Sequence, residues 1–139
     1  MPADFVIDIH AGVVFTKGAG VLGRDDVLQH NARLIAHADF RPQFSQLMDV
    51  SAVSKIEISV NELEQLTIPT VFERTSRRAI LVASDLQYGV GRMAEVFSEM
   101  NGQTGVRVFR DAQEAFAFLG IDGVPPADAF TRLVSPAHS

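Results

Sequence analysis

The sequence predicts an α/β domain built on a mostly parallel sheet of about five strands, with an N-terminal β-hairpin and four helices. Residues 5–9 and 13–16 are two apolar, β-branched runs separated by a turn that contains glycine, as in a hairpin. After them, strand-like and helix-like segments alternate, which is typical of parallel sheets with crossover helices. Residues 79–83 are continuously apolar, as expected of a central strand that is covered on both faces.

The hairpin leads into the first helix through a glycine-rich segment. Asp25 and Asp26 indicate the start of a helix over 24–38, because negative charge is favoured in the first turn of a helix. The three glycines before this helix have the G-x-G-x-x-G spacing of dinucleotide-binding loops. We interpret them as turn and bulge residues, because the preceding strand belongs to a hairpin and the two aspartates would repel a phosphate. These glycines are Gly18, Gly20 and Gly23.

The middle of the chain predicts a strand, a serine-rich loop and a helix. Residues 44–50 are mostly apolar and form the central strand, after which the loop begins. Ser59 and Glu62 have the spacing of a capping box, in which each side chain bonds the backbone amide of the other, so a helix begins there. We expect this helix to run over 59–74 with a kink or interruption at Pro69.

The second half of the chain predicts two further strand–helix units. The strand at 79–83 is followed by a helix for which Ser84 or Asp85 is the N-cap. The last strand, at 106–109, precedes a short helix at 111–119. These two units complete the sheet.

Length and composition indicate one domain that does not bind nucleic acid. At 139 residues the chain fits a single domain, which we place at 1–120, followed by a C-terminal tail at 121–139 that could form a short helix. The net charge of -5 disfavours nucleic acid as a partner, and the absence of cysteine excludes disulfides and thiolate metal sites. No apolar run approaches the roughly 20 residues that span a bilayer, and the N-terminus lacks the pattern of a signal peptide. We therefore expect a cytoplasmic protein without integral membrane contact.

Residues 48–63, MDVSAVSKIEISVNEL, resemble a segment of anti-sigma-factor antagonist (STAS) domains that reads roughly D-L-S-x-V-x-x-x-D-S-S-G-L. The resemblance covers about residues 4–120 and implies a SpoIIAA-like fold. It also implies a non-enzymatic regulatory or protein-interaction module, whose partner would be another protein such as a regulator or a kinase. Further segments that resemble uncharacterised bacterial STAS/SEC14-like proteins are DFRPQF at 39–44, RAILV at 78–82, YGVGRM at 88–93 and the unit at 106–115.

By position, the resemblance places Ser59 on the serine that is phosphorylated in sigma-regulating STAS domains. The surrounding residues depart from the family pattern, because Glu57 and Ile58 replace an aspartate and a serine, and Val60 replaces a glycine. A degenerate phosphoserine switch is therefore one interpretation. The other, which we favour, is a helix N-cap that stabilises the fold by about 1 kcal/mol. The candidate phosphorylation or partner loop comprises Asp49, Ser51, Ser54 and Ser59.

Two groups of residues lie where the predicted strands end, which is the edge at which parallel sheets place their binding loops. Asp49 could bind a cation or transfer a proton. More often such an aspartate orders its own loop by accepting hydrogen bonds from nearby amides, here that of Ser51. Tyr88, Gly89 and Arg92 follow the neighbouring strand and are a candidate contact for a ligand or a partner.

The other charged residues predict no site. The predicted strand at 79–83 has three arginines before it and Arg92 after it, so these side chains lie at opposite ends of the sheet. We therefore expect them to be solvated or ion-paired rather than to share an anion pocket. The three arginines before the strand are Arg74, Arg77 and Arg78. The four histidines lack metal-ligand spacing, so we expect them on the surface and expect no metal or cofactor. Neither a nucleophile elbow nor a P-loop occurs, so we expect no enzyme activity. The histidines are His10, His30, His37 and His138.

Two functions stay open at this point. The first is the regulatory or protein-interaction module. The alternative is a small carrier of an apolar or amphipathic ligand, which the SEC14-like part of the resemblance and the ten phenylalanines suggest. A module predicts a filled core, whereas a carrier predicts a cavity lined by phenylalanines. Both allow a homodimer.

Overall fold

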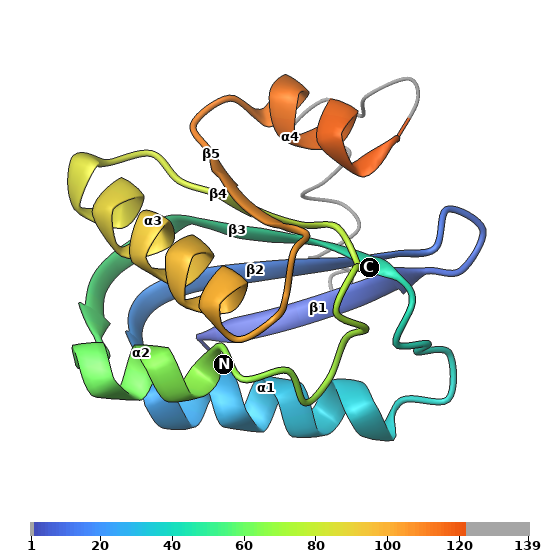
Figure 1. Ribbon diagram of the computed structural model, residues 1–139, viewed down its shortest axis with the longest axis horizontal. Helices are drawn as coiled ribbons and strands as arrows, with labels where there is room; N and C mark the ends of the chain where they lie inside the picture. Colours follow the sequence, from blue (N-terminus) through green and yellow to red (C-terminus); the bar gives the residue numbers. More distant parts are fainter. Residues whose placement is uncertain (1, 122–139) are drawn as a thin grey trace.

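The computed structural model describes residues 2–121, which form one five-stranded sheet and four helices (Figure 1). The strands are neighbours in the order β1-β2-β3-β4-β5; β1 and β2 form an antiparallel hairpin, and the later pairs are parallel. The predicted fold class is therefore confirmed. Of the predicted tail at 121–139, residues 122–139 lie outside the described residues, and His138 is among them. The elements are β1 (Ala3–Asp8), β2 (Val13–Gly23), α1 (Arg24–Ala36), β3 (Ser45–Glu57), α2 (Val60–Leu66), β4 (Arg78–Leu81), α3 (Asp85–Met100), β5 (Val106–Phe109) and α4 (Ala112–Leu119).

The sheet carries α4 on one face and α1, α2 and α3 on the other (Figure 1). Side chains alternate between the two faces along each strand. Leu47 and Ala79 face α4, where they pack against Ala115 and Phe116. Ile80, the next residue along β4, belongs to a separate cluster that packs under α3. The domain therefore has a core on each side of the sheet.

The strands β2 and β3 extend further than predicted. The prediction ends them at residues 16 and 50, but the pair continues in parallel register to Gly23 and Glu57. The predicted serine-rich loop is therefore wrong, because those residues are the second half of β3. A polar strand is stable here because the two backbones satisfy each other's hydrogen bonds while Ser51 and Ser54 face water.

The glycines of β2 allow the strand to bend. The register of β2 against β3 shifts between Lys17 and Ala19 and again between Gly20 and Val21. Gly20 has a φ of +70°, in the left-handed region that favours glycine. Each shift spans one more residue of β3 than of β2, so the extra residues lie in β3 opposite the glycines. The predicted turn is wrong, because the strand continues to Gly23.

Helix α2 is shorter than predicted. The helix expected over 59–74 ends at Leu66. Pro69 explains the early end, because the residue before a proline, here Ile68, is disfavoured in helical backbone. The irregular segment that follows buries Phe72 in the cluster beneath α1.

Helix α3 approaches the sheet closely at Gly91. A Cβ added at this position would lie 2.7 Å from Cγ2 of Val108 on β5, so a side chain there requires the sheet or the helix to move. Two residues earlier, at Gly89, an added Cβ would meet no atom of the described chain within 4 Å. The close approach at one turn fixes the distance between α3 and the sheet.

Candidate functional site

Ser59 is the N-cap of α2. Its Oγ accepts a hydrogen bond from the amide of Glu62 (3.1 Å), and the amide of Ser59 donates to Oε1 of Glu62 (2.9 Å). The predicted capping box is therefore present. Ser59 is also exposed, so phosphorylation of this serine stays a prediction.

The other three residues of the predicted loop lie in β3. Oδ1 of Asp49 accepts hydrogen bonds from the amide (2.9 Å) and the hydroxyl (2.6 Å) of Ser51, which is the local role that the sequence indicates. Ser54 is exposed further along the strand. Because these residues belong to an extended strand, they are spread along it and do not form one loop with Ser59.

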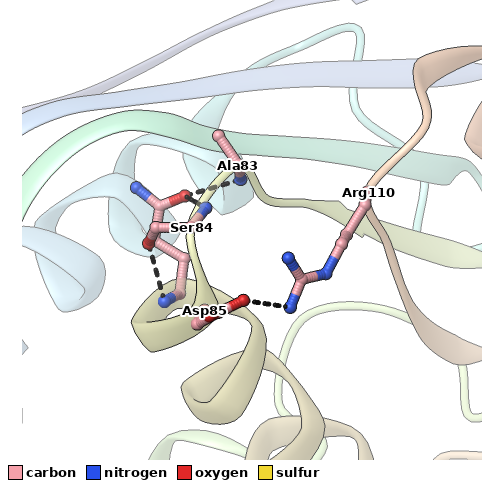
Figure 2. A network of polar contacts seen from close by, with 5 residues as sticks. Ala83, Ser84, Asp85 and Arg110 are labelled. Atoms are coloured by element: carbon pink, nitrogen blue, oxygen red, sulfur yellow. Dashed lines mark hydrogen bonds and ion pairs between the residues drawn. The ribbon is translucent and has the colours of Figure 1, made fainter.

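Helix α3 begins beside this half of β3. Oε1 of Gln87 accepts hydrogen bonds from the amides of Ala83 (2.7 Å) and Ser84 (3.1 Å), while Oγ of Ser84 accepts one from the amide of Gln87 (3.1 Å; Figure 2). Nε2 of Gln87 donates to the carbonyl oxygens of Val53 (2.9 Å) and Ser51 (3.3 Å). This one side chain both caps the helix and ties it to β3.

Tyr88 packs under an arginine at the start of α3. Its side chain is half-buried against the cluster of Ile80, and the guanidinium carbon of Arg110 lies 4.6 Å from the centre of its ring. Arg110 also forms an ion pair with Asp85, at 2.8 Å (Figure 2). The side chain of Tyr88 is thus packed between the cluster of Ile80 and Arg110.

Gly89 and Arg92 lie on the exposed side of α3. Gly89 is exposed, and Nη1 of Arg92 pairs with Oε2 of Glu95 on the same helix at 2.7 Å. Tyr88, Gly89 and Arg92 are close in sequence, but the structure places them in different surroundings. Their role as a contact for a ligand or a partner stays a prediction.

A cavity of about 180 Å³ lies between the sheet and the helices α1, α2 and α3. Most of its wall is apolar, with Val27 on α1, Leu63 on α2, Ala94 on α3, and Met48 and Ile80 on the sheet. No phenylalanine and no acidic residue is among the described residues that line it. The expected lining of phenylalanines is therefore wrong, because these rings pack in the clusters on either side of the sheet.

Five polar side chains, which we call the polar row, cross the sheet beneath these helices, and all of them line the cavity. Nε of Arg78 on β4 donates to Oε1 of Gln46 on β3 (3.0 Å), and Nε2 of Gln46 donates to Oγ1 of Thr16 on β2 (2.9 Å). Oγ1 of Thr16 lies 3.0 Å from Nε2 of His30 on α1, and Nδ1 of His30 lies 3.0 Å from Oδ1 of Asn31. The row joins three strands to α1.

The hydrogen bonds of the polar row run in one direction, because an arginine side chain only donates. Nε of Arg78 donates to the side-chain oxygen of Gln46, so the side-chain nitrogen of Gln46 faces Thr16. The oxygen of Thr16 accepts this bond and also lies within hydrogen-bond distance of Nε2 of His30. When the Thr16 hydroxyl donates to Nε2, the imidazole is neutral with its hydrogen on Nδ1, which donates to Asn31.

His30 is buried, so the prediction of a surface position is wrong. Only 4% of its surface is exposed, and its ring packs edge-on against Phe5 with 5.3 Å between the ring centres. Burial lowers the pKa of His30 below its ordinary value of 6.5, although the hydrogen bond to Asn31 opposes the shift. The lowered pKa favours the neutral imidazole.

The prediction that Arg78 is solvated or ion-paired is also wrong. Burial lowers the pKa of Arg78 to about 10, and no acidic side chain within residues 2–121 pairs with it. Nη1 of Arg78 donates to Oε1 of Gln103 (2.9 Å), and its guanidinium carbon lies 4.6 Å from the ring centre of Phe72. Gln103 in turn donates to the carbonyl oxygen of Thr67 at the end of α2.

A weak signal for the polar row does exist in the sequence. Gln46 occupies an inward position of β3, two residues before Met48, which also lines the cavity. A polar residue at an inward position of a strand needs a buried partner. That partner, Arg78, is 32 residues away in the chain and is paired with Gln46 only through the register of β3 and β4.

The described residues contain neither a membrane-spanning helix nor a metal-binding cluster. None of their helices is long and apolar enough to cross a membrane. Nor do three or more of their histidine, aspartate or glutamate side chains gather in a way that could hold a metal ion.

The structure is similar to the crystal structure of an uncharacterised protein of the DUF3478 family from Shewanella loihica, which is described as having a SpoIIAA-like fold. The match has a TM-score of 0.53 at 21% identity and covers 77% of this chain and 83% of that chain. No family model matches the chain, and no curated protein matches its sequence. At this level of identity the likeness concerns the fold alone. It confirms the resemblance seen in the sequence: the chain folds as a SpoIIAA-like α/β domain.

Proposed function

We propose that this SpoIIAA-like domain is a non-catalytic binding module that holds a small amphipathic ligand in the cavity between the sheet and α1, α2 and α3. The observation that carries the proposal is the pairing of an apolar wall with the polar row in one cavity. The apolar wall favours the burial of hydrocarbon, and the polar groups fix its orientation. This is the carrier alternative, with an aliphatic instead of an aromatic wall.

The volume of the cavity limits the ligand to a small molecule. The cavity measures about 180 Å³. For comparison, an engineered apolar cavity of about 150 Å³ in another protein binds benzene. A single ring or a short branched chain with one polar substituent therefore fits, whereas a membrane lipid with full acyl chains does not.

Benzyl alcohol is a suitable neutral probe for this cavity. We expect its titration to move the amide resonances of Leu63 and Ala94 saturably in ¹⁵N–¹H NMR spectra, because both residues line the cavity. Ala94→Leu fills part of the space and should weaken binding at least tenfold. The control is Ala32→Leu on the exposed side of α1, which should bind as the unmodified protein does.

The outcome that contradicts the proposal is equally clear. If no probe of this size shifts these resonances, or if Ala94→Leu and Ala32→Leu bind benzyl alcohol equally, the cavity does not bind small amphiphiles. A thermal-unfolding scan of each variant shows whether it is folded before binding is compared.

A second candidate function is a regulatory contact at Ser59, supported by the exposure of this serine. Ser59 caps the helix whose other residues Leu63 and Leu66 line the cavity, so occupancy of the cavity and a modification of Ser59 would act on the same helix. Glu62 opposes a phosphate at this position, because its carboxylate already bonds the Ser59 amide. Mass spectrometry of the protein from its own host tests the switch; unmodified Ser59 under all growth conditions would exclude it.

A further inference from the structure

Arg78 is a cation at the edge of the cavity, and no acidic side chain of residues 2–121 pairs with it. Its side chain lines the cavity, and no aspartate or glutamate among the described lining residues faces it. Two of its nitrogens are engaged, Nε by Gln46 and Nη1 by Gln103. No hydrogen bond joins Nη2 to another side chain or backbone group of residues 2–121. Nη2 is not among the buried unpaired atoms of these residues, so this donor group is open to water or to a ligand.

The surroundings of Arg78 stabilise its charge only through dipoles and a ring. The carbonyl oxygens of Gln46 and Gln103 accept its hydrogen bonds, and Phe72 offers its ring face at 4.6 Å. These groups are neutral, so the described lining residues carry a net positive charge; burial favours the neutral form of the other titratable lining residue, His30. Buried charges in proteins are normally paired. A ligand that carries one negative charge would complete the pairing.

We propose that the ligand of the cavity is a small apolar monocarboxylate and that its carboxylate is bound by Arg78. This inference rests on the proposed function, because it needs the cavity to bind a ligand. Arginine and carboxylate match in geometry, and their hydrogen bonds are charge-assisted and therefore strong. The apolar part of the acid, with about six to eight carbons, lies against Ala94, Leu63 and Ile80.

Phenylacetate and 2-phenylethanol are the matched probes for this proposal. They share the ring and the chain length, and only phenylacetate carries a charge. We expect isothermal titration calorimetry to show phenylacetate binding about tenfold or more tightly than 2-phenylethanol. Arg78→Met, which keeps an unbranched stem and removes the guanidinium with its charge, should abolish this preference while leaving binding of 2-phenylethanol. The control is Arg77→Met at the exposed neighbouring position, which should keep the preference.

A second measurement uses the unmodified protein and does not depend on the folding of the Arg78 variant. We expect carboxyl-¹³C-labelled phenylacetate to keep the chemical shift of the anion, when bound, to a pH clearly below its pKa in water, because the guanidinium favours the charged form. If both probes bind equally, or if the bound acid takes up its proton as in water, the role of Arg78 is wrong while the cavity function stands. If neither probe binds, the proposed function itself fails.

Discussion

Replacing Thr16 with valine is the most direct test of the polar row, because the two side chains have nearly the same shape. The substitution removes the oxygen that accepts from Gln46 and the hydroxyl that bonds to His30. Thr16 is only 8% exposed. In the valine variant, Nε2 of Gln46 and Nε2 of His30 both lose a partner inside the protein.

The size of the effect follows from these two lost bonds. A buried polar group that loses its partner costs about 1–3 kcal/mol, so two such groups cost roughly 4 kcal/mol. The extra methyl group of valine returns about 0.8 kcal/mol through burial. We therefore expect the free energy of unfolding to fall by about 3 kcal/mol, a large share of the roughly 5–15 kcal/mol of a typical domain.

Urea unfolding at neutral pH, followed by circular dichroism, measures this change. The midpoint should fall while the slope m stays constant, because the surface exposed on unfolding is the same. Thr104→Val is the control at an exposed position, and it should change stability by less than about 0.5 kcal/mol. If Thr16→Val costs no more than this control, the polar row does not stabilise the fold and its hydrogen bonds are replaced by water.

Three further predictions concern α3, α2 and α1. Gly91→Ala should destabilise the protein by about 1–3 kcal/mol, because the added Cβ has no room against the sheet. Gly89→Ala should stabilise it by up to about 1 kcal/mol, because alanine is the better helix former and the position is open. Thermal unfolding measures both changes, and a change of the same sign in the two variants would contradict the packing of α3. Ser59→Ala should cost about 1 kcal/mol in urea unfolding through loss of the N-cap, against almost nothing for Ser54→Ala; similar costs would argue against the cap. Because burial lowers the pKa of His30, the unfolded chain binds the proton more readily, so the stability that this group contributes is complete above about pH 6.5 and is lost as the pH falls towards its folded pKa. His30→Gln should flatten that part of the stability–pH curve, and an unchanged curve would assign the pH dependence to other groups.

The parts of the fold that local sequence determines could be predicted. The N-caps Ser59 and Ser84 each depend on residues at most three positions away, so the spacing with Glu62 and Gln87 suffices to place the helix starts. The order of strands and helices likewise follows from the pattern of apolar residues. The end of β3 could not be found in this way, because its second half is held by backbone hydrogen bonds to β2 and not by an apolar pattern.

The candidate site depends on contacts between distant residues, and for that reason the sequence did not reveal it. Arg78 and Gln46 are neighbours only in the register of two parallel strands. His30 reaches Thr16 only because α1 packs on that face of the sheet. Charge and polarity predict a surface position for each of these residues taken alone, and the partners found in the folded protein explain why Thr16, His30 and Gln46 are buried and Arg78 is half-buried.

The side chain of Gln87 covers part of an unpaired strand edge of the sheet. β4 pairs with β3 only as far as Asp49, so within residues 2–121 the backbone edge of β3 beyond that point has no neighbouring strand on this side. An exposed strand edge is a template to which a further strand can add. The amide of Gln87 occupies this edge by donating to the carbonyl oxygens of Ser51 and Val53. A further strand therefore cannot bond these two carbonyl oxygens while the side chain of Gln87 holds them.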